Sequence, residues 1–175
     1  MALLCLLLGM ALALFAVSRY AAWSYPRDCA DIVERCAAQY DLPPSLLYAL
    51  IRTESHFNAR AVSSADARGL TQITPETFEW LLLKTGETLP LEALFEEEVS
   101  VRYGAFFLRM LLDEFGETRT ALAAYHAGRG QVNRWLRDPE VSPDGRTLER
   151  IPFAETEHYV RKVTLAEKRY RMVWR

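Results

Sequence analysis

Cysteine and histidine are scarce in this chain, which has three of each among its 175 residues. Cys29 and Cys36 are seven residues apart in a segment with helical periodicity, so they lie about 10 Å apart along the helix axis. A disulfide cannot bridge that distance without distorting the helix, and no pair of cysteines or histidines has metal-ligand spacing. We therefore expect core packing for both cysteines, whereas Cys5 lies in an apolar N-terminal run. Neither a metal nor a cofactor is expected.

Positive charge is not in excess either. Lysine and arginine total 21 against 23 aspartates and glutamates, which gives a net charge of −2. No basic stripe with interleaved aromatic residues is present, so nucleic acid is not an expected partner. The chain also lacks internal repeats and low-complexity tracts. Half of it is apolar and a quarter is charged, as is typical of one packed globular domain.

One long apolar run opens the chain, since Met1 to Val17 contain no charged side chain and Arg19 ends the run. A helix needs roughly 17–25 apolar residues to span a bilayer. Segment 1–22 therefore predicts a single-pass membrane anchor, with the rest of the chain on the outer side. A cleaved signal peptide is the alternative, with residues 16–18 as the cleavage site. A helix buried in the core is a third interpretation.

The rest of the chain has helical periodicity and no sustained strand alternation, which predicts an all-α domain over residues 28–172. Thr74 and Pro75 form a typical helix start, and Gly116 is a typical helix stop. The predicted helices are residues 28–39, one that starts at 43–45, one that starts at 74–76, and residues 96–115, 121–127, 132–136 and 155–170. The predicted loops are residues 58–69, 86–90 and 139–152.

Glu54 is the candidate for acid–base chemistry. It follows Ile51 by three residues and Leu50 by four, which places it on the apolar face of a helix near its C-terminal end. Burial disfavours the charged carboxylate, and the negative end of the helix dipole acts in the same direction. Both effects raise the pKa of the carboxyl group, as a general acid at neutral pH requires. A glutamate that faces solvent or pairs with an arginine is the alternative.

Four short motifs follow one another from Glu54 toward the C-terminus. They occupy residues 54–58, 69–75, 124–128 and 151–160, and Ser63 and Gln72 stand nine and eighteen residues after Glu54. In this order they resemble the signature of the soluble lytic transglycosylase catalytic domain, a family with the lysozyme-like fold, close to goose-type lysozyme. The resemblance covers residues 28–172 and implies a bacterial enzyme whose substrate is the glycan strand of peptidoglycan.

The resemblance also implies a role for each motif residue. Glu54 would protonate the glycosidic oxygen between N-acetylmuramic acid and N-acetylglucosamine. It would then accept a proton from the muramyl 6-hydroxyl, which closes on C1 and leaves a 1,6-anhydro end. Tyr159 would hydrogen-bond near Glu54 and fix its orientation. The residues implied to bind substrate are Ser63, Gln72, Tyr125, His126 and Tyr159.

Three positions depart from the family pattern. Thr71 stands where the family usually has Met, which is expected to alter contacts to the sugar. His126 replaces Asn and can still donate a hydrogen bond. Asp66 stands where the family often has Gly, and Asp tolerates a left-handed backbone better than most residues.

Other interpretations remain open at this point. Hydrolysis, as in goose-type lysozyme, usually needs a second carboxylate, for which Asp66 is the best candidate. A non-catalytic protein that binds or assembles cell-wall glycan is another alternative. Ser63 and Gln72 could instead satisfy loop backbone groups, and Tyr125, Tyr159 and Trp80 could be core residues. So small a chain also suggests a recruiting protein partner, although no residues identify one.

Overall fold

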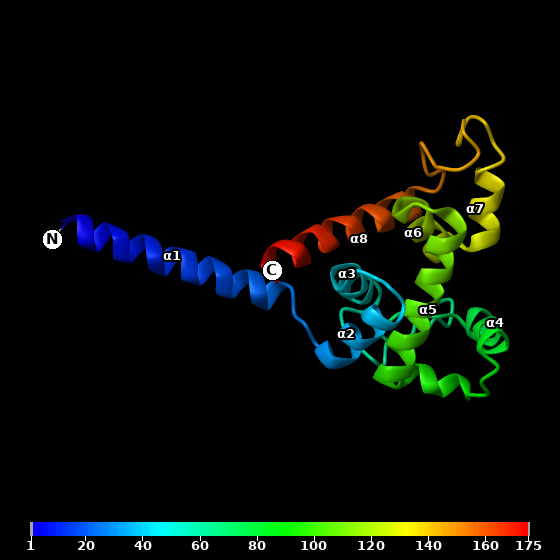
Figure 1. The fold of residues 1–175 in the computed structure, drawn as a ribbon, viewed down its shortest axis with the longest axis horizontal. Helices are drawn as coiled ribbons and strands as arrows, with labels where there is room; N and C mark the ends of the chain where they lie inside the picture. The colour runs from blue at the N-terminus through cyan, green and yellow to red at the C-terminus, as the bar shows by residue number, and fades with distance from the viewer. Residues whose placement is uncertain (1, 175) are drawn as a thin grey trace.

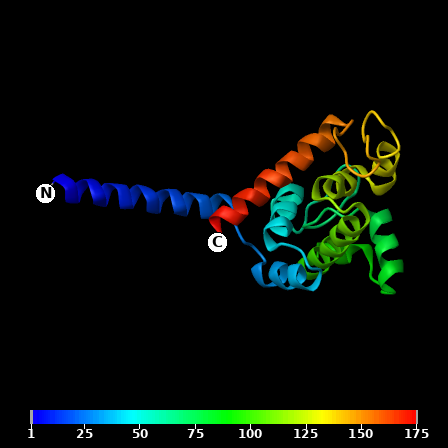
Figure 2. The same cartoon turned by 45° about the horizontal axis from the view of Figure 1, so that its top comes forward.

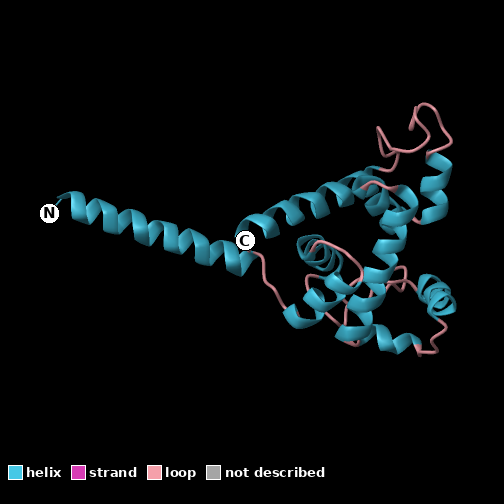
Figure 3. Ribbon diagram, viewed as in Figure 1, coloured by secondary structure: helices cyan, strands magenta, loops and turns pink. Residues whose placement is uncertain are grey.

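The computed structural model describes residues 2–174, so Met1 of the predicted N-terminal segment lies outside the described residues. The side chains of residues 2–5, Cys5 among them, and of Ala22 also lie outside this description. Within the described chain all regular elements are helices (Figures 1 and 3), which confirms the all-α prediction. They are α1 (Ala2–Ser24), α2 (Ala30–Gln39), α3 (Pro44–Ser55), α4 (Pro75–Thr85), η1 (Leu91–Phe95), α5 (Glu97–Phe115), α6 (Thr118–Ala127), α7 (Arg129–Trp135) and α8 (Ala154–Val173).

The ends of the helices follow local backbone chemistry. Pro75 opens α4 behind Thr74, whose side chain accepts the Thr77 N–H at 3.3 Å. Gly116 ends α5 with a φ of 69°, which a residue without Cβ adopts at little cost. Helix α2 begins two residues later than predicted, because Cys29 has a left-handed backbone with a φ of 57°. Helices α6 and α7 begin earlier than predicted and are separated by Gly128 alone.

Helix α3 is the centre of the domain. All six residues from Leu46 to Ile51 are at most 2% exposed, which means that every side of this helix is covered. Helices α2 and α8 pack against it, and α5 packs against α2 and α6 (Figure 2). A helix that is apolar all round is stable only inside a core. This burial determines the surroundings of any side chain on the last turn of α3.

The first helix, α1, extends away from this domain in both views (Figures 1 and 2). Its side chains from Leu6 to Val17 are exposed, so it is not the buried core helix considered from the sequence. None of the helices in residues 2–174 meets the combined length and hydropathy that a membrane span requires. The predicted transmembrane segment is therefore not supported by the structure.

The residues after α1 are held by the C-terminal end of α8. The Tyr170 hydroxyl donates to the Pro26 carbonyl and the Trp174 indole N–H to the Tyr25 carbonyl, each at 2.9 Å. The rings of Tyr25 and Tyr170 pack edge to face, 5.3 Å apart. Nearby, Cys29 and Cys36 are free thiols that pack in or against the core, as predicted.

Candidate active site

Glu54 lies on the last turn of the central helix, one residue before α3 ends. There the Ser55 hydroxyl lies 2.8 Å from the Leu70 carbonyl, to which it donates, and 3.2 Å from the Ile51 carbonyl. This contact joins the end of α3 to the loop that precedes α4. His56 and Phe57 then take left-handed backbone conformations and turn the chain away from the helix. Ser55 belongs to the first sequence motif, residues 54–58, but its role in joining helix and loop was not predicted.

The carboxyl group of Glu54 faces Tyr159 of α8. The Tyr159 hydroxyl donates to Oε1 of Glu54 at 2.5 Å, and Tyr159 itself is buried. Burial raises the pKa of Glu54 to about 7, although the hydrogen bond from Tyr159 and the positive charge of Lys162 act in the opposite direction. A carboxylic acid with this pKa is substantially protonated at neutral pH and can act as a general acid.

Tyr125 of α6 lies near Glu54 and contacts the loop that precedes α4. Its hydroxyl donates to the Thr71 carbonyl at 2.8 Å, and its ring packs against Phe107 with centroids 5.0 Å apart. Burial and the charge of nearby Glu54 both raise the pKa of Tyr125 well above its usual value. Tyr125 therefore stays a neutral phenol beside the acid.

The side chain of Thr71 points into the core. It is fully buried, and its hydroxyl donates to the Ser100 carbonyl of α5 at 2.7 Å. It packs so closely on Gly104 that a Cβ there would lie 2.4 Å from Thr71 Cγ2. The expectation that Thr71 alters contacts to the sugar is therefore wrong for its side chain, because α5 covers it.

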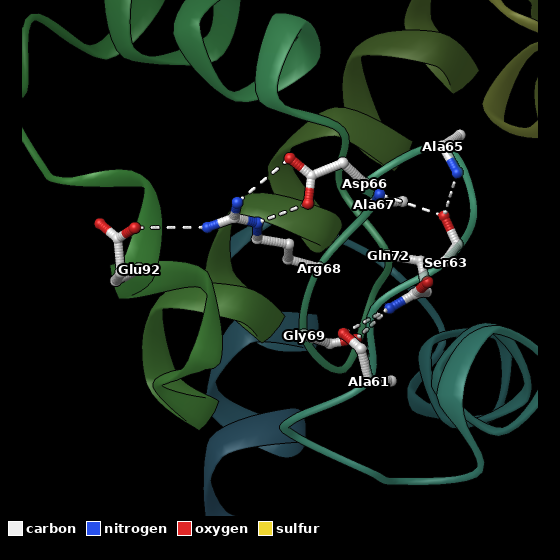
Figure 4. Close-up of polar contacts among 9 residues, drawn as sticks. All are labelled: Ala61, Ser63, Ala65, Asp66, Ala67, Arg68, Gly69, Gln72 and Glu92. Carbon is white, nitrogen blue, oxygen red and sulfur yellow. Dashed lines mark hydrogen bonds and ion pairs between the residues drawn. The ribbon is translucent and has the colours of Figure 1, made fainter.

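Ser63 and Gln72 hold the loop between α3 and α4 together (Figure 4). The Ser63 hydroxyl accepts the backbone N–H groups of Ala65 at 3.2 Å and Ala67 at 3.1 Å. The Gln72 amide donates to the carbonyls of Ala61 at 3.1 Å and Gly69 at 3.0 Å. These contacts match the interpretation in which both residues satisfy loop backbone groups. Substrate binding by Ser63 and Gln72 stays a prediction.

Asp66 occupies the left-handed conformation that the sequence suggested, with a φ of 58°. Its two carboxylate oxygens accept from Arg68 at 3.0 and 3.1 Å, and Arg68 also lies 3.4 Å from Glu92 (Figure 4). The guanidinium of Arg68 holds the pKa of Asp66 below its usual range. Asp66 is thus an ionised, paired carboxylate that stabilises the loop.

His126 is stacked on the ring of Tyr159, whose hydroxyl is bonded to Glu54. The centroids of the His126 and Tyr159 rings are 4.5 Å apart with an interplanar angle of 29°, and His126 Nδ1 lies 3.1 Å from the Thr156 hydroxyl. Burial lowers the pKa of His126, which favours the neutral ring. His126 also lines a hollow of about 470 Å³ beside Phe153 and Glu155. The three motif residues Glu54, Tyr159 and His126 are therefore brought together, although they come from three helices.

A second hollow adjoins Tyr125, with a volume of about 440 Å³. Its floor is aromatic, formed by Trp80, Phe107 and Tyr125, and its rim includes Arg129 and Asn133. Trp80 is therefore a partly exposed wall of this hollow as well as a packing partner of Phe107. Among the residues whose side chains are described, no group of three potential metal ligands is found.

A central helix that ends in a partly buried, tyrosine-bound carboxyl group, enclosed by further helices, matches the lysozyme-like domain that the sequence resemblance implies. The chain belongs to the transglycosylase SLT domain family, whose profile matches residues 31–144. The resemblance noted in the sequence is thereby confirmed.

The chain is also similar to individual lytic transglycosylases. The soluble lytic murein transglycosylase of Escherichia coli K12 is 32% identical over 152 residues, which cover 84% of this chain and 23% of that protein. The membrane-bound lytic murein transglycosylase C of Actinobacillus pleuropneumoniae serotype 5b is 30% identical, covering 82% of this chain and 46% of that protein. The X-ray structure of an inactive Glu-to-Gln mutant of lytic transglycosylase Slt from Pseudomonas aeruginosa has a TM-score of 0.73 and 30% identity, covering 85% and 25% of the two chains. This chain thus spans less than half the length of each of these relatives.

Proposed function

We propose that this protein is a peptidoglycan lytic transglycosylase with Glu54 as its acid and base. The observation that carries the proposal is the carboxyl group of Glu54, which is partly buried, bound by Tyr159 and has a pKa of about 7. A binding module has no need of such a group, whereas a general acid requires it. Membership of the transglycosylase SLT domain family and the names of the relatives support the same activity.

In the proposed reaction Glu54 first donates its proton to the glycosidic oxygen between N-acetylmuramic acid and N-acetylglucosamine. The bond from C1 to that oxygen breaks, and the N-acetylglucosamine leaves with a free 4-hydroxyl. The Glu54 carboxylate then accepts the proton of the muramyl 6-hydroxyl while O6 bonds to C1. The product has a 1,6-anhydro end, no water is consumed, and Glu54 is protonated again. Because Tyr159 donates a hydrogen bond to Oε1, it fixes the orientation of the carboxyl group. The other oxygen, Oε2, then donates and later accepts the transferred proton.

Hydrolysis is the less favoured reaction because the candidate second carboxylate is already engaged. Asp66 accepts two hydrogen bonds from Arg68, and this pairing directs its charge into the loop. In the lytic reaction the acetamido group of the substrate stabilises the intermediate, so a second carboxylate is not required. Substrate contacts by Ser63, Gln72, Tyr125 and His126 belong to the same proposal.

Segment 1–22 is proposed to bring the domain to the outer face of the bacterial cell membrane, either as an anchor or as a signal that is removed. Its support is the row of exposed apolar side chains from Leu6 to Val17, which water solvates poorly. A relative named as membrane-bound is consistent with it. Membrane fractionation and the mass of the mature N-terminus distinguish the two forms.

The test of the reaction compares the full chain with Glu54→Gln on purified peptidoglycan. Glu79→Gln, an exposed glutamate on α4, is the matched control. Mass spectrometry of the released muropeptides should show products lighter by one water than reducing muropeptides, from the wild type and Glu79→Gln but not from Glu54→Gln. Reducing ends would establish a hydrolase instead. No release by any of the three proteins would overturn the catalytic proposal.

A further inference from the structure

The C-terminal half of α8 has an outer face that combines exposed apolar and cationic side chains. Leu165 is 56% exposed and Met172 is 50% exposed. They are seven residues apart, two helical turns, with Lys168 and Arg169 exposed between them. Among the described residues no carboxylate forms an ion pair with Lys168 or Arg169, whereas Arg171 pairs with Glu167 at 3.5 Å. Single exposed apolar side chains are normal on a protein surface, so what distinguishes this face is their combination with cations that no described carboxylate pairs with.

A hollow of about 620 Å³ adjoins this face. Its cationic wall is formed by Arg27, Lys168 and Arg171, and its aromatic wall includes Trp174 and Tyr48. The guanidinium of Arg27 lies 5.4 Å from the ring centroids of both Tyr48 and Trp174, which fixes that charge at the edge of the hollow. Glu34 also lines the hollow, but it is paired with Arg27. Arg171 is paired with Glu167, so Lys168 is the cation of the hollow that no described carboxylate pairs with, and it favours an anionic group.

This face lies where α1 joins the domain. The C-terminus and the end of α1 lie side by side in both views (Figures 1 and 2), and Trp174 donates to the Tyr25 carbonyl at 2.9 Å. Tyr20 and Trp23, both exposed, occupy the last turns of α1. Lys168 is nine residues beyond Tyr159 on α8, hence about 14 Å farther along the helix than the catalytic region. The face is therefore separate from the proposed active site.

We propose that a lipid-contact face on α8, formed by Leu165, Lys168, Arg169 and Met172, binds an anionic phospholipid surface, with headgroup phosphates entering the adjoining hollow beside Lys168. Apolar side chains that enter the headgroup region beside Lys and Arg side chains that meet phosphates are the pattern of interfacial membrane binding. The inference is independent of the proposed cleavage reaction and of whether α1 crosses a bilayer.

The experiment measures binding of the full chain to vesicles of phosphatidylcholine, with or without phosphatidylglycerol. The double variant Lys168→Gln/Arg169→Gln is compared with Arg137→Gln/Arg146→Gln, which removes two exposed charges near the opposite end of α8. The first variant should bind vesicles that contain phosphatidylglycerol more weakly, by a factor on the order of ten or more, and the control should bind as the wild type. Binding to pure phosphatidylcholine, to which α1 contributes, should be the same for all three.

Two further measurements keep the test decisive. Equal cleavage of soluble peptidoglycan by both variants shows that they fold, and Leu165→Ser/Met172→Ser should weaken vesicle binding without removing charge. Equal binding of all variants to anionic vesicles would overturn the proposal. So would binding of inorganic phosphate to the protein without any preference for vesicles that contain phosphatidylglycerol, because the hollow would then be a site for free phosphate.

Discussion

At the scale of single residues, the chemistry of Glu54 depends on how strongly its neighbours stabilise the charged form. Burial raises its pKa to about 7, and the hydrogen bond from Tyr159 limits that rise. A stronger stabilisation would leave a carboxylate that cannot act as an acid, and a weaker one would leave an acid that cannot act as a base afterwards. The stacked ring of His126 in turn holds Tyr159 in place. The proposed reaction needs both protonation states, and a pKa near neutrality provides them.

Replacing Tyr159 with Phe tests this balance. Tyr159→Phe removes the hydroxyl that donates to Glu54, so the charged form loses stabilisation and the pKa of Glu54 rises further above about 7. The alkaline limb of kcat/KM, where Glu54 loses the proton it must donate, should move to higher pH. The plateau rate should fall about tenfold, because the acid is no longer oriented. A pH–rate profile on peptidoglycan measures both effects.

The control for this experiment is Tyr40→Phe. Tyr40 is a half-buried tyrosine whose ring packs against Phe106 of α5. Its profile should match that of the wild type. If Tyr159→Phe keeps the same alkaline limb as the wild type, then Tyr159 has only a packing role.

At the scale of elements, the loop from Asn58 to Thr74 connects the acid to the rest of the domain. Its turns meet at Gly69, whose φ is 76°. The Gly69 N–H donates to the Ala61 carbonyl at 3.0 Å, and its carbonyl accepts from Gln72. No side chain can occupy position 69, because a Cβ there would lie 1.9 Å from the Leu94 carbonyl oxygen. The loop can therefore approach η1 only with glycine at this position.

Gly69→Ala should consequently destabilise the protein by about 3 kcal/mol or more, since overpacking adds to the cost of the left-handed backbone. Gly86→Ala is the matched control. Gly86 has a similar φ of 72°, but no atom lies within 4 Å of the site of its Cβ. That variant should lose only about 1 kcal/mol. Urea unfolding followed by circular dichroism gives the free energy of unfolding of both variants. Equal losses of that free energy would show that the contact with Leu94 does not account for the effect of Gly69→Ala.

Sequence periodicity was sufficient for elements that bury one face or all faces over many residues. The long α5 and the central α3 follow from apolar spacing, with Pro44 as the first residue of α3 and Gly116 as the C-cap of α5. The short helix Leu91–Phe95 was not predicted, since five residues after Pro90 are too few to show a period. The start of α6 was placed too late because its first turn, Thr118 to Thr120, is polar.

The site was predictable only in part, and for a physical reason. The environment of Glu54 follows from local helical spacing, and the resemblance to the family suggested Tyr159 as its partner. The contact of Ser55 with Leu70 depends on how the loop folds back, and the pairing of Asp66 with Arg68 depends on the local backbone conformation of the loop. Spacing along the chain contains no information on such contacts, so the carboxylate of Asp66 could not be assigned to a structural role from the sequence.

At the scale of the whole molecule, the C-terminal end of the chain is fastened to the segment that follows α1. Trp174 and Tyr170 each donate to a backbone carbonyl in the segment that follows α1, and Arg27 lies between the rings of Tyr48 and Trp174. Arg52 also covers the face of Tyr25, 4.6 Å from its centroid. This junction limits the directions that α1 can take relative to the domain. The lipid-contact face and α1 would therefore meet a membrane together.

Trp174→Ala should open this junction without unfolding the domain. The indole is 41% exposed, so its removal should cost little global stability, but the segment around Tyr25 loses a hydrogen bond and Arg27 loses one of its two aromatic partners. A protease must bind the backbone around its cleavage site in an extended form, which the fastened junction prevents. Limited digestion of the full chain with trypsin should thus cut after Arg27 several times faster in Trp174→Ala, with a melting temperature within a few degrees of the wild type. Met172→Ala removes an exposed side chain from the same end of α8, and trypsin should cut this variant after Arg27 at the wild-type rate. If Trp174→Ala and the wild type are cut at Arg27 equally fast, then Trp174 does not fasten the junction.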